Sequence, residues 1–226
     1  IASLRFGTIF NPYPFTLSPK DIIRYVNLTD STIIFCQDEH YTGLDNLTSC
    51  DTVLVTKDTI EENQYSDEPW EDFSPEKNSP ACMYYSSGTT GNPKNILFSY
   101  HNMVTNISSI VRGFKFSKED IHLIVLPLGH TASINYSFLP AILCGGTIVL
   151  AESFWKVRAQ LWSLIKKYSV TYLEVVPSIL LALLNTPYKE DDYANINSIR
   201  FFGCGSSMLP LDRQIRFMEK YGVKVA

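Results

Sequence analysis

The sequence predicts an α/β fold with mostly parallel sheets covered by helices. Short apolar segments alternate along the chain with longer segments whose apolar residues follow helical spacing. The short segments are apolar throughout rather than at every second residue, as is typical of parallel strands buried on both faces. The chain has 226 residues, 45% of them hydrophobic, which is enough to bury a core without disulfides. We expect one large domain or two small ones.

The first part of the chain predicts three strands and one helix. The strands are expected over residues 7–10, 31–36 and 52–56. Ser18 is suited to cap the helix, Pro19 suits its first turn, and the Asp21 carboxylate can reach back to Ser18. The expected buried face of this helix consists of Ile22, Ile23 and Val26.

Residues 57–80 differ from the rest of the chain in composition. They contain eight acidic residues, two lysines and three prolines. Charge runs of this kind are usually solvated, so we interpret the segment as an acidic surface connection rather than a binding surface.

After Pro80 the alternation of strands and helices becomes regular. Further strands are expected over residues 81–85, 96–98, 122–126, 147–151, 171–176, 199–202 and 223–226. Helices are expected over residues 100–111, 131–143, 153–168, 177–184 and 211–221. Ser99 is suited to cap the first of these helices, and Gly222 is suited to end the last in the left-handed conformation.

Charge and hydropathy exclude some classes of protein. The net charge of −4 argues against a nucleic acid as main partner, because binding phosphates over a broad face needs a basic surplus. No apolar run approaches the roughly 18 residues of a membrane-spanning helix. Five scattered cysteines without a C-x-x-C pair indicate reduced thiols, and with no signal peptide in view we expect a cytoplasmic protein without a metal site.

One segment, residues 85–94, carries a chemical signal. It reads Tyr-Ser-Ser-Gly-Thr-Thr-Gly-Asn-Pro-Lys and follows a buried strand. Such a loop can turn successive backbone N–H groups toward one point, and its hydroxyls and Lys94 add donors and positive charge. The natural ligand is a polyphosphate. The spacing is neither that of a Walker A loop nor that of a G-x-G-x-x-G fingerprint, and hydroxyl and glycine content alone would also fit a polar turn.

The full string is more specific than its composition. Ser-Ser-Gly-Thr-Thr-Gly-x-Pro-Lys resembles the phosphate loop of the adenylate-forming superfamily, which includes acyl-CoA synthetases, aryl-CoA ligases, peptide-synthetase adenylation domains and luciferases. The resemblance extends over nearly the whole chain. It includes residues 7–36, the helix start at 99–102, the Leu-Pro-x-x-His motif at 126–130 and the glycine-rich segment at 202–207.

The resemblance implies a role for each matching residue. The β- and γ-phosphates of ATP would be held by Ser86, Ser87, Gly88, Thr89, Thr90 and Gly91, with Lys94 attracting the pyrophosphate. His130 would lie beside the acyl site. The wall between adenine and the substrate carboxylate would consist of Gly203, Cys204, Gly205, Ser206 and Ser207. No His or Asp pattern makes Cys204 a nucleophile, so we expect it to pack.

The family reaction has two steps. A carboxylate attacks the α-phosphorus of Mg-ATP to give an acyl-adenylate and pyrophosphate. A thiol of coenzyme A or of a carrier pantetheine, on a possible acyl-carrier protein, then takes the acyl group. The physical requirement is charge neutralisation at the triphosphate together with in-line positioning.

Three positions depart from the family pattern. Asn95 stands where a glycine normally follows the loop lysine; asparagine tolerates positive φ, so a turn could survive there. Tyr100 replaces a histidine, and Ser207 replaces a common proline. None of these changes removes a phosphate contact.

Further motifs of the family are not in this sequence. The glutamate that holds Mg²⁺ and the small C-terminal domain with its catalytic lysine would follow Ala226. We therefore expect the chain to be a fragment of the large N-terminal domain of an acid–thiol ligase, unable to complete adenylation alone. The alternative is a truncated, non-catalytic module that binds a nucleotide or a partner.

The substrate class depends on acidic residues. Amino-acid-activating members use an aspartate to pair the α-ammonium group, but no aspartate lies between Asp120 and Asp191, where the only acids are Glu152, Glu174 and Glu190. An unpaired buried ammonium group would be costly. We therefore favour a fatty, aryl or other organic acid over the alternative, an amino-acid adenylation domain.

Overall fold

The computed structural model describes residues 2–13, 17–36, 43–44, 47, 50–55, 74–86 and 94–226. The chain divides into two compact units. One comprises Ile1–Pro12 and Ser74–Ala226, and the other comprises Tyr13–Phe73. Most of the acidic segment 57–80 lies outside the described residues, and residues 74–80 are largely exposed.

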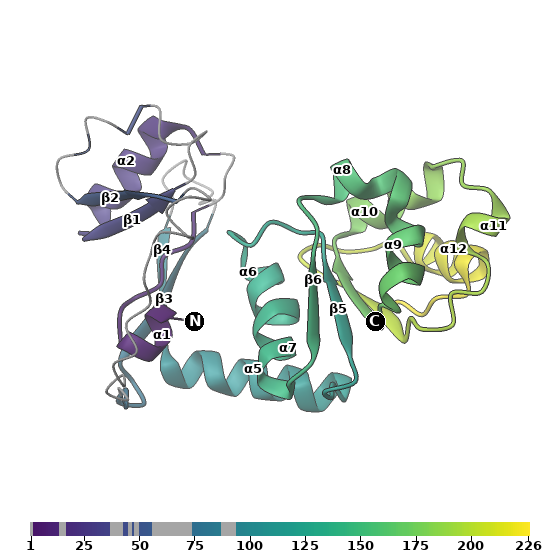
Figure 1. The fold of residues 1–226 in the computed structure, drawn as a ribbon, viewed down its shortest axis with the longest axis horizontal. Coiled ribbons are helices and arrows are strands. Elements are labelled where there is room, and N and C mark those ends of the chain that lie inside the picture. Colours follow the sequence, from purple (N-terminus) through teal and green to yellow (C-terminus); the bar gives the residue numbers. More distant parts are fainter. Residues whose placement is uncertain are drawn as a thin grey trace. The chain divides into compact units, whose positions relative to one another are not determined.

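The smaller unit contains two paired strands and one helix. Strand β1 (Ile33–Cys36) and strand β2 (Asp51–Leu54) are parallel, and helix α2 (Pro19–Leu28) packs against them through Ile22 and Val26 (Figure 1). Ser18 caps α2 as predicted, accepting the Asp21 N–H at 3.2 Å. The Asp21 carboxylate reaches back to the Ser18 hydroxyl, which donates to it at 2.6 Å.

The larger unit is organised around a parallel four-stranded sheet. Its strands are β5 (Ile121–Ile124), β6 (Thr147–Leu150), β7 (Tyr172–Val175) and β8 (Phe201–Cys204). Their order in the sheet is β6-β5-β7-β8. Strands β5 and β7 are therefore neighbours in the sheet, although β6 lies between them in the sequence. Val225 adds a parallel bridge to Phe202, where a strand over 223–226 was predicted.

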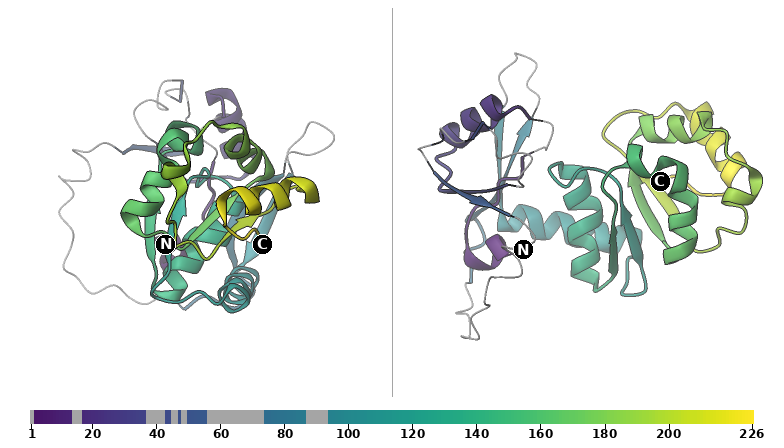
Figure 2. Two further views of the ribbon diagram at one scale, coloured as in Figure 1. Left: turned by 90° about the vertical axis from the view of Figure 1, so that its right-hand side faces the viewer. Right: turned by 45° about the horizontal axis from the view of Figure 1, so that its top comes forward.

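Helices cover both faces of this sheet, as predicted. Figure 1 and Figure 2 show α6 (Thr131–Ser133) and α7 (Leu139–Cys144) on one face and α9 (Leu161–Tyr168), α10 (Pro177–Asn185) and α12 (Leu211–Tyr221) on the other. The shorter elements are α1 (Ala2–Phe6), α8 (Phe154–Val157), the 3₁₀ turn η2 (Arg158–Gln160) and α11 (Glu190–Tyr193). The main core lies on the α9, α10 and α12 side and is filled by large side chains such as Trp162, Phe202 and Phe217.

Two further elements carry the phosphate-loop sequence and the helix after it. Strand β3 (Pro80–Ser86) and strand β4 (Lys94–Ser99) form an antiparallel hairpin, followed at once by helix α5 (Tyr100–Phe114). Ser99 caps α5 as predicted, and Asn102 completes a capping box.

Three expected elements differ from the structure. The strand predicted over 7–10 is wrong, because residues 2–6 form α1 and only Phe10 bridges Cys82. The helix predicted over 131–143 contains a π-helical turn, η1 (Ile134–Phe138), in which the Leu139 N–H bonds the carbonyl of Ile134. The reason is Pro140, which has no N–H and whose ring excludes the carbonyl four residues earlier. The helix predicted over 153–168 is interrupted by η2.

A partly buried ion pair between Asp120 and Arg200 links the segments at the amino ends of the sheet strands. Asp120, just before β5, is 3% exposed and accepts from Arg200 at 2.7 Å, from the Thr171 hydroxyl at 2.8 Å and from the Ser117 N–H at 2.8 Å. Burial alone would raise the pKa of Asp120, but these donors outweigh it and hold the pKa below its ordinary value. The carboxylate thus ties together the segments that start β5, β7 and β8.

A buried histidine lies on the face of the sheet that α6 and α7 cover. His122 is fully buried, with its ring 4.5 Å from that of Phe116 and 5.1 Å from that of Tyr172. Burial lowers the pKa of His122 to about 4, which nearby Asp120 only partly opposes. The imidazole is therefore neutral in the folded protein at physiological pH.

This histidine predicts a loss of stability in mild acid. The unfolded state binds the proton near pH 6.5 and the folded state only near pH 4, so stability falls as the pH is lowered through this window. Relative to His122→Phe, the wild type should lose about 2 kcal/mol between pH 7.5 and pH 5. Urea unfolding of both proteins at the two pH values measures this difference, and equal losses would contradict a neutral buried imidazole.

Candidate active site

The strand order of the sheet defines where a ligand can bind. From β5 the chain goes to β6 on one side, and from β7 it goes to β8 on the other. In open parallel sheets, ligands bind outside the carboxyl ends of the strands where the order reverses in this way. The reversal lies between β5 and β7, so the segments that follow these strands and β8 are the candidate site.

His130 lies at this carboxyl edge. It ends the turn that follows β5 and stands directly before α6, where its N–H bonds the carbonyl of Pro127 at 3.0 Å. The buried Ser133 hydroxyl donates to the same carbonyl at 2.7 Å and so fixes the turn. The His130 side chain is exposed and makes no hydrogen bond with the described residues, so its imidazole is available to a ligand.

The glycine-rich segment reaches the same edge two strands away. Gly203 and Cys204 end β8, and the residues that follow turn away from the sheet. Ser206 has a φ of +71°, a backbone conformation that residues other than glycine and asparagine seldom adopt. Ser206 and Ser207 are exposed, whereas Gly203 is buried.

Sequence reasoning did not identify Glu174 as a site residue. It stands in β7 directly opposite Gly203, is 6% exposed and accepts a hydrogen bond from Tyr172. Burial raises the pKa of Glu174 to about 7. The available signal in the sequence was an acidic residue inside an otherwise apolar strand.

The phosphate-loop residues Ser87, Gly88, Thr89, Thr90 and Gly91 lie outside the described residues. Both ends of the loop are described: Ser86 ends β3, Lys94 begins β4, and the two are direct partners in the hairpin. The hairpin therefore fixes the two ends of the loop against each other. No hydrogen bond or ion pair among the described residues links Lys94 to the carboxyl edge of the sheet.

The structure also accounts for two of the departures from the family pattern. Asn95 lies in β4 opposite Tyr85 and is not among the described residues with positive φ, so this position forms a strand rather than a turn. Tyr100 begins α5, and its hydroxyl donates to the carbonyl of Leu4 at 2.8 Å, which attaches α1 to the start of α5.

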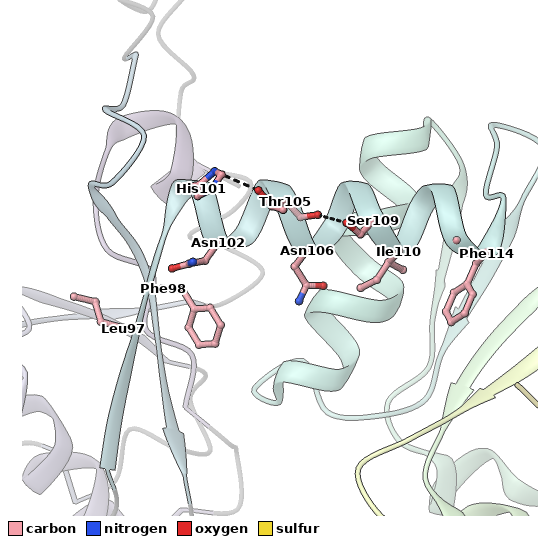
Figure 3. A pocket seen from close by; sticks show the side chains of 10 residues that line it. Leu97, Phe98, His101, Asn102, Thr105, Asn106, Ser109, Ile110 and Phe114 are labelled. Carbon is pink, nitrogen blue, oxygen red and sulfur yellow. Dashed lines mark hydrogen bonds between the residues drawn. The ribbon is translucent and has the colours of Figure 1, made fainter.

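A groove runs along β4 and α5 (Figure 3). It has a volume of about 790 Å³ and is lined by Phe98, His101, Asn106, Ile110 and their neighbours. Some of its polar side chains are engaged within α5 itself, since His101 bonds Thr105 and Ser109 donates to the Thr105 carbonyl. None of the predicted site residues that the structure describes lines this groove.

In the part of the chain that the structure describes, no three His, Cys, Asp or Glu side chains group together to hold a metal ion. None of the helices in the same ranges is long and apolar enough to cross a membrane. All five cysteines are described and are free thiols.

Solved structures match the fold of the chain. The ATP-bound MatB from Rhodopseudomonas palustris aligns with a TM-score of 0.87 at 20% identity, over 99% of this chain and 45% of that one. The inhibitor-bound N-terminal domain of FACL13 from Mycobacterium tuberculosis aligns with a TM-score of 0.84 at 20% identity, over 99% of this chain and 56% of that one.

Sequence relatives are CoA ligases. A sulfoacetate–CoA ligase from Cupriavidus necator is 30% identical over 156 residues, covering 67% of this chain and 28% of the ligase. A 4-coumarate–CoA ligase from Narcissus pseudonarcissus is 28% identical over 230 residues, covering 95% of this chain and 40% of the ligase. The chain thus spans less than half the length of these relatives. The model of the AMP-binding enzyme family matches residues 1–226, so the chain belongs to this family of adenylate-forming enzymes.

Proposed function

We propose that the protein carrying this chain is an ATP-dependent acid–thiol ligase. It converts a carboxylic acid to an acyl-adenylate and transfers the acyl group to the thiol of coenzyme A or of a carrier pantetheine. The observation that carries the proposal is the family match over the whole chain, supported by the CoA-ligase relatives. Because the reaction uses ATP and coenzyme A, we place it in the cytoplasm.

Each predicted site residue has its own role in the first step, the formation of the acyl-adenylate. The loop residues 86–91 donate backbone N–H groups and hydroxyls to the β- and γ-phosphates, and Lys94 adds a positive charge for the departing pyrophosphate. His130 contacts the acyl side, and Gly203–Ser207 separate adenine from the substrate carboxylate. A carboxylate oxygen then attacks the α-phosphorus from the side opposite pyrophosphate, and the P–O bond to pyrophosphate breaks.

The substrate is an acid without an α-amine. Glu152 is exposed and already paired with Lys156, so it is not placed to receive a buried ammonium group. Glu174 is buried, and because its pKa is raised to about 7 it is only partly ionised near pH 7, whereas Glu190 is exposed. The names of the relatives, coumarate, feruloyl and sulfoacetate ligases, also specify acids without an α-amine.

A pyrophosphate-exchange screen tests this function. The protein is incubated with labelled pyrophosphate, Mg-ATP and a panel of fatty, aryl, small organic and amino acids. We expect label to enter ATP with one or more acids that lack an α-amine. Exchange with amino acids alone would overturn the substrate class, and the absence of both exchange and ATP binding would overturn the ligase itself.

A further inference from the structure

Glu174 is a buried ionisable group directly beside the glycine-rich segment Gly203–Ser207. It lies at the carboxyl end of β7, where the strand order reverses, and directly opposite Gly203 on β8. The two strands stay paired beyond it, since the Gly205 N–H bonds the carbonyl of Val175 at 3.3 Å. The side chain at position 174 therefore lies directly beside the start of the glycine-rich segment.

The carboxyl group occupies the space that a side chain at position 203 would take. A Cβ atom added at Gly203 would lie 2.1 Å from Glu174 Oε2 and 2.5 Å from the Tyr172 hydroxyl, both closer than real Cβ atoms approach. A Cβ atom at Gly205 would lie 3.6 Å from Glu174 Oε1, which is an ordinary van der Waals contact. The carboxyl group thus packs directly under Gly203 and contacts the start of the segment, and a side chain at 203 would have to displace Glu174 and Tyr172.

The surroundings of the carboxyl group contain hydroxyls, a thiol and rings rather than cations. Tyr172 on β7 donates a hydrogen bond to Glu174 Oε2. Tyr136 on η1 contributes to the raised pKa of Tyr172, which is caused mainly by burial and by Glu174. Cys204 on β8 has its pKa raised to about 11 by burial and by Glu174, and the His122 ring on β5 packs against Tyr172. Among the described residues no lysine or arginine pairs with Glu174, and none donates to Oε1.

We propose that Glu174 is a positioning residue that supports the Gly203–Ser207 segment in its uncharged form and thereby favours nucleotide binding. This inference rests on the proposed function, because it takes the segment to face the nucleotide. The uncharged acid packs under Gly203 and keeps its bond to Tyr172. The ionised form would place a negative charge with no cationic partner among the described residues beneath the segment that adjoins the substrate carboxylate, which is unfavourable in a dry interior.

Linkage gives this role a measurable signature. If ATP binds better to the protonated form, then ATP binding draws a proton onto Glu174 near pH 7.5. Glu174→Gln keeps the size and the hydrogen-bonding capacity of the side chain but has no proton to take up. A residue that only fills space would give the same proton balance in both proteins.

The first experiment is titration calorimetry with ATP on the protein that carries this chain. Measurements in two buffers of different ionisation enthalpy, from pH 6 to pH 8.5, give both the affinity and the number of protons taken up. We expect the wild type to take up more protons than Glu174→Gln at pH 7.5. We also expect the wild type to lose about tenfold more affinity than the variant between the two pH limits.

Glu152→Gln is the matched control, since Glu152 is an exposed glutamate outside the site. It should behave as the wild type does at every pH. ATP binding with the same proton uptake in the wild type and in Glu174→Gln would overturn the inference and leave the ligase function standing. Failure of the wild type to bind ATP at any pH would overturn both.

A second experiment tests the packing contact. Gly203→Ala is made in the wild type and in the Tyr172→Phe/Glu174→Ala background, which removes the two groups that its Cβ would meet. We expect the alanine to weaken ATP binding and lower the melting temperature strongly in the wild type and much less in that background. Equal losses in both would show that Glu174 does not position Gly203, and the melting temperature reports this even if a variant no longer binds ATP.

Discussion

Asp120→Ala should lower the free energy of unfolding by about 3 kcal/mol. The substitution leaves the Arg200 guanidinium without its carboxylate partner and removes the acceptor for the Thr171 hydroxyl and the Ser117 N–H. Breaking one side of a buried pair can cost more than this, but the Arg200 side chain is 36% exposed and water can replace part of the interaction. Urea unfolding at pH 7 measures the change.

Asp212→Ala provides the control for this prediction. Asp212 is 73% exposed and pairs with its neighbour Arg213, so its loss should change stability by less than about 0.5 kcal/mol. Similar small changes at both positions would mean that the Asp120 network does not hold the sheet together. The stability that Asp120 contributes should also be lost in strong acid. Its pKa is lower in the folded state than in the unfolded state, so this contribution is complete above the ordinary carboxyl pKa and is lost as the pH falls below that value.

Thr90→Ala/Lys94→Ala should reduce carboxylate-dependent pyrophosphate exchange by about 100-fold or more. The double variant removes one hydroxyl donor and the positive charge from the segment proposed to hold the triphosphate. Lys94 begins β4 on the outside of the hairpin, so the loss should appear in exchange and in ATP affinity rather than in stability.

Lys156→Ala is the corresponding control, because Lys156 is an exposed lysine that pairs with Glu152 away from the site. It removes the same charge from the protein and should leave exchange unchanged. A double variant that exchanges as well as this control would show that the segment 86–94 does not bind the phosphates.

The sequence predicts most elements of this fold because local signals and burial agree. Ser99 has both a capping side chain and a favourable residue three positions later, and α5 begins there. The apolar strands β5 and β7 become parallel and buried, as their composition indicates. Agreement of this kind fails at Pro140, where the helical spacing continues but the ring forbids one backbone bond and a π-helical turn results.

Only part of the candidate site can be predicted from the sequence. Motifs identify His130 and Gly203–Ser207, and strand order then places both at one edge of the sheet. Glu174 belongs to no motif, and its position depends on pairing with a strand almost thirty residues later in the sequence, in the register that sets it against Gly203. Register across a parallel sheet cannot be obtained from local pattern, because the connecting segments set no fixed offset.

The neighbouring position of β5 and β7 also affects how the protein folds. Pairing β5 with β7 joins His122 to Tyr172 across the whole of β6 and its helices, whereas the hairpin joins Ser86 to Lys94 across one short loop. Contacts that close long segments lose more chain entropy and form slowly. The candidate site lies where β5 and β7 meet, so it can be complete only once this long-range pairing has formed, and we expect the hairpin to form before it.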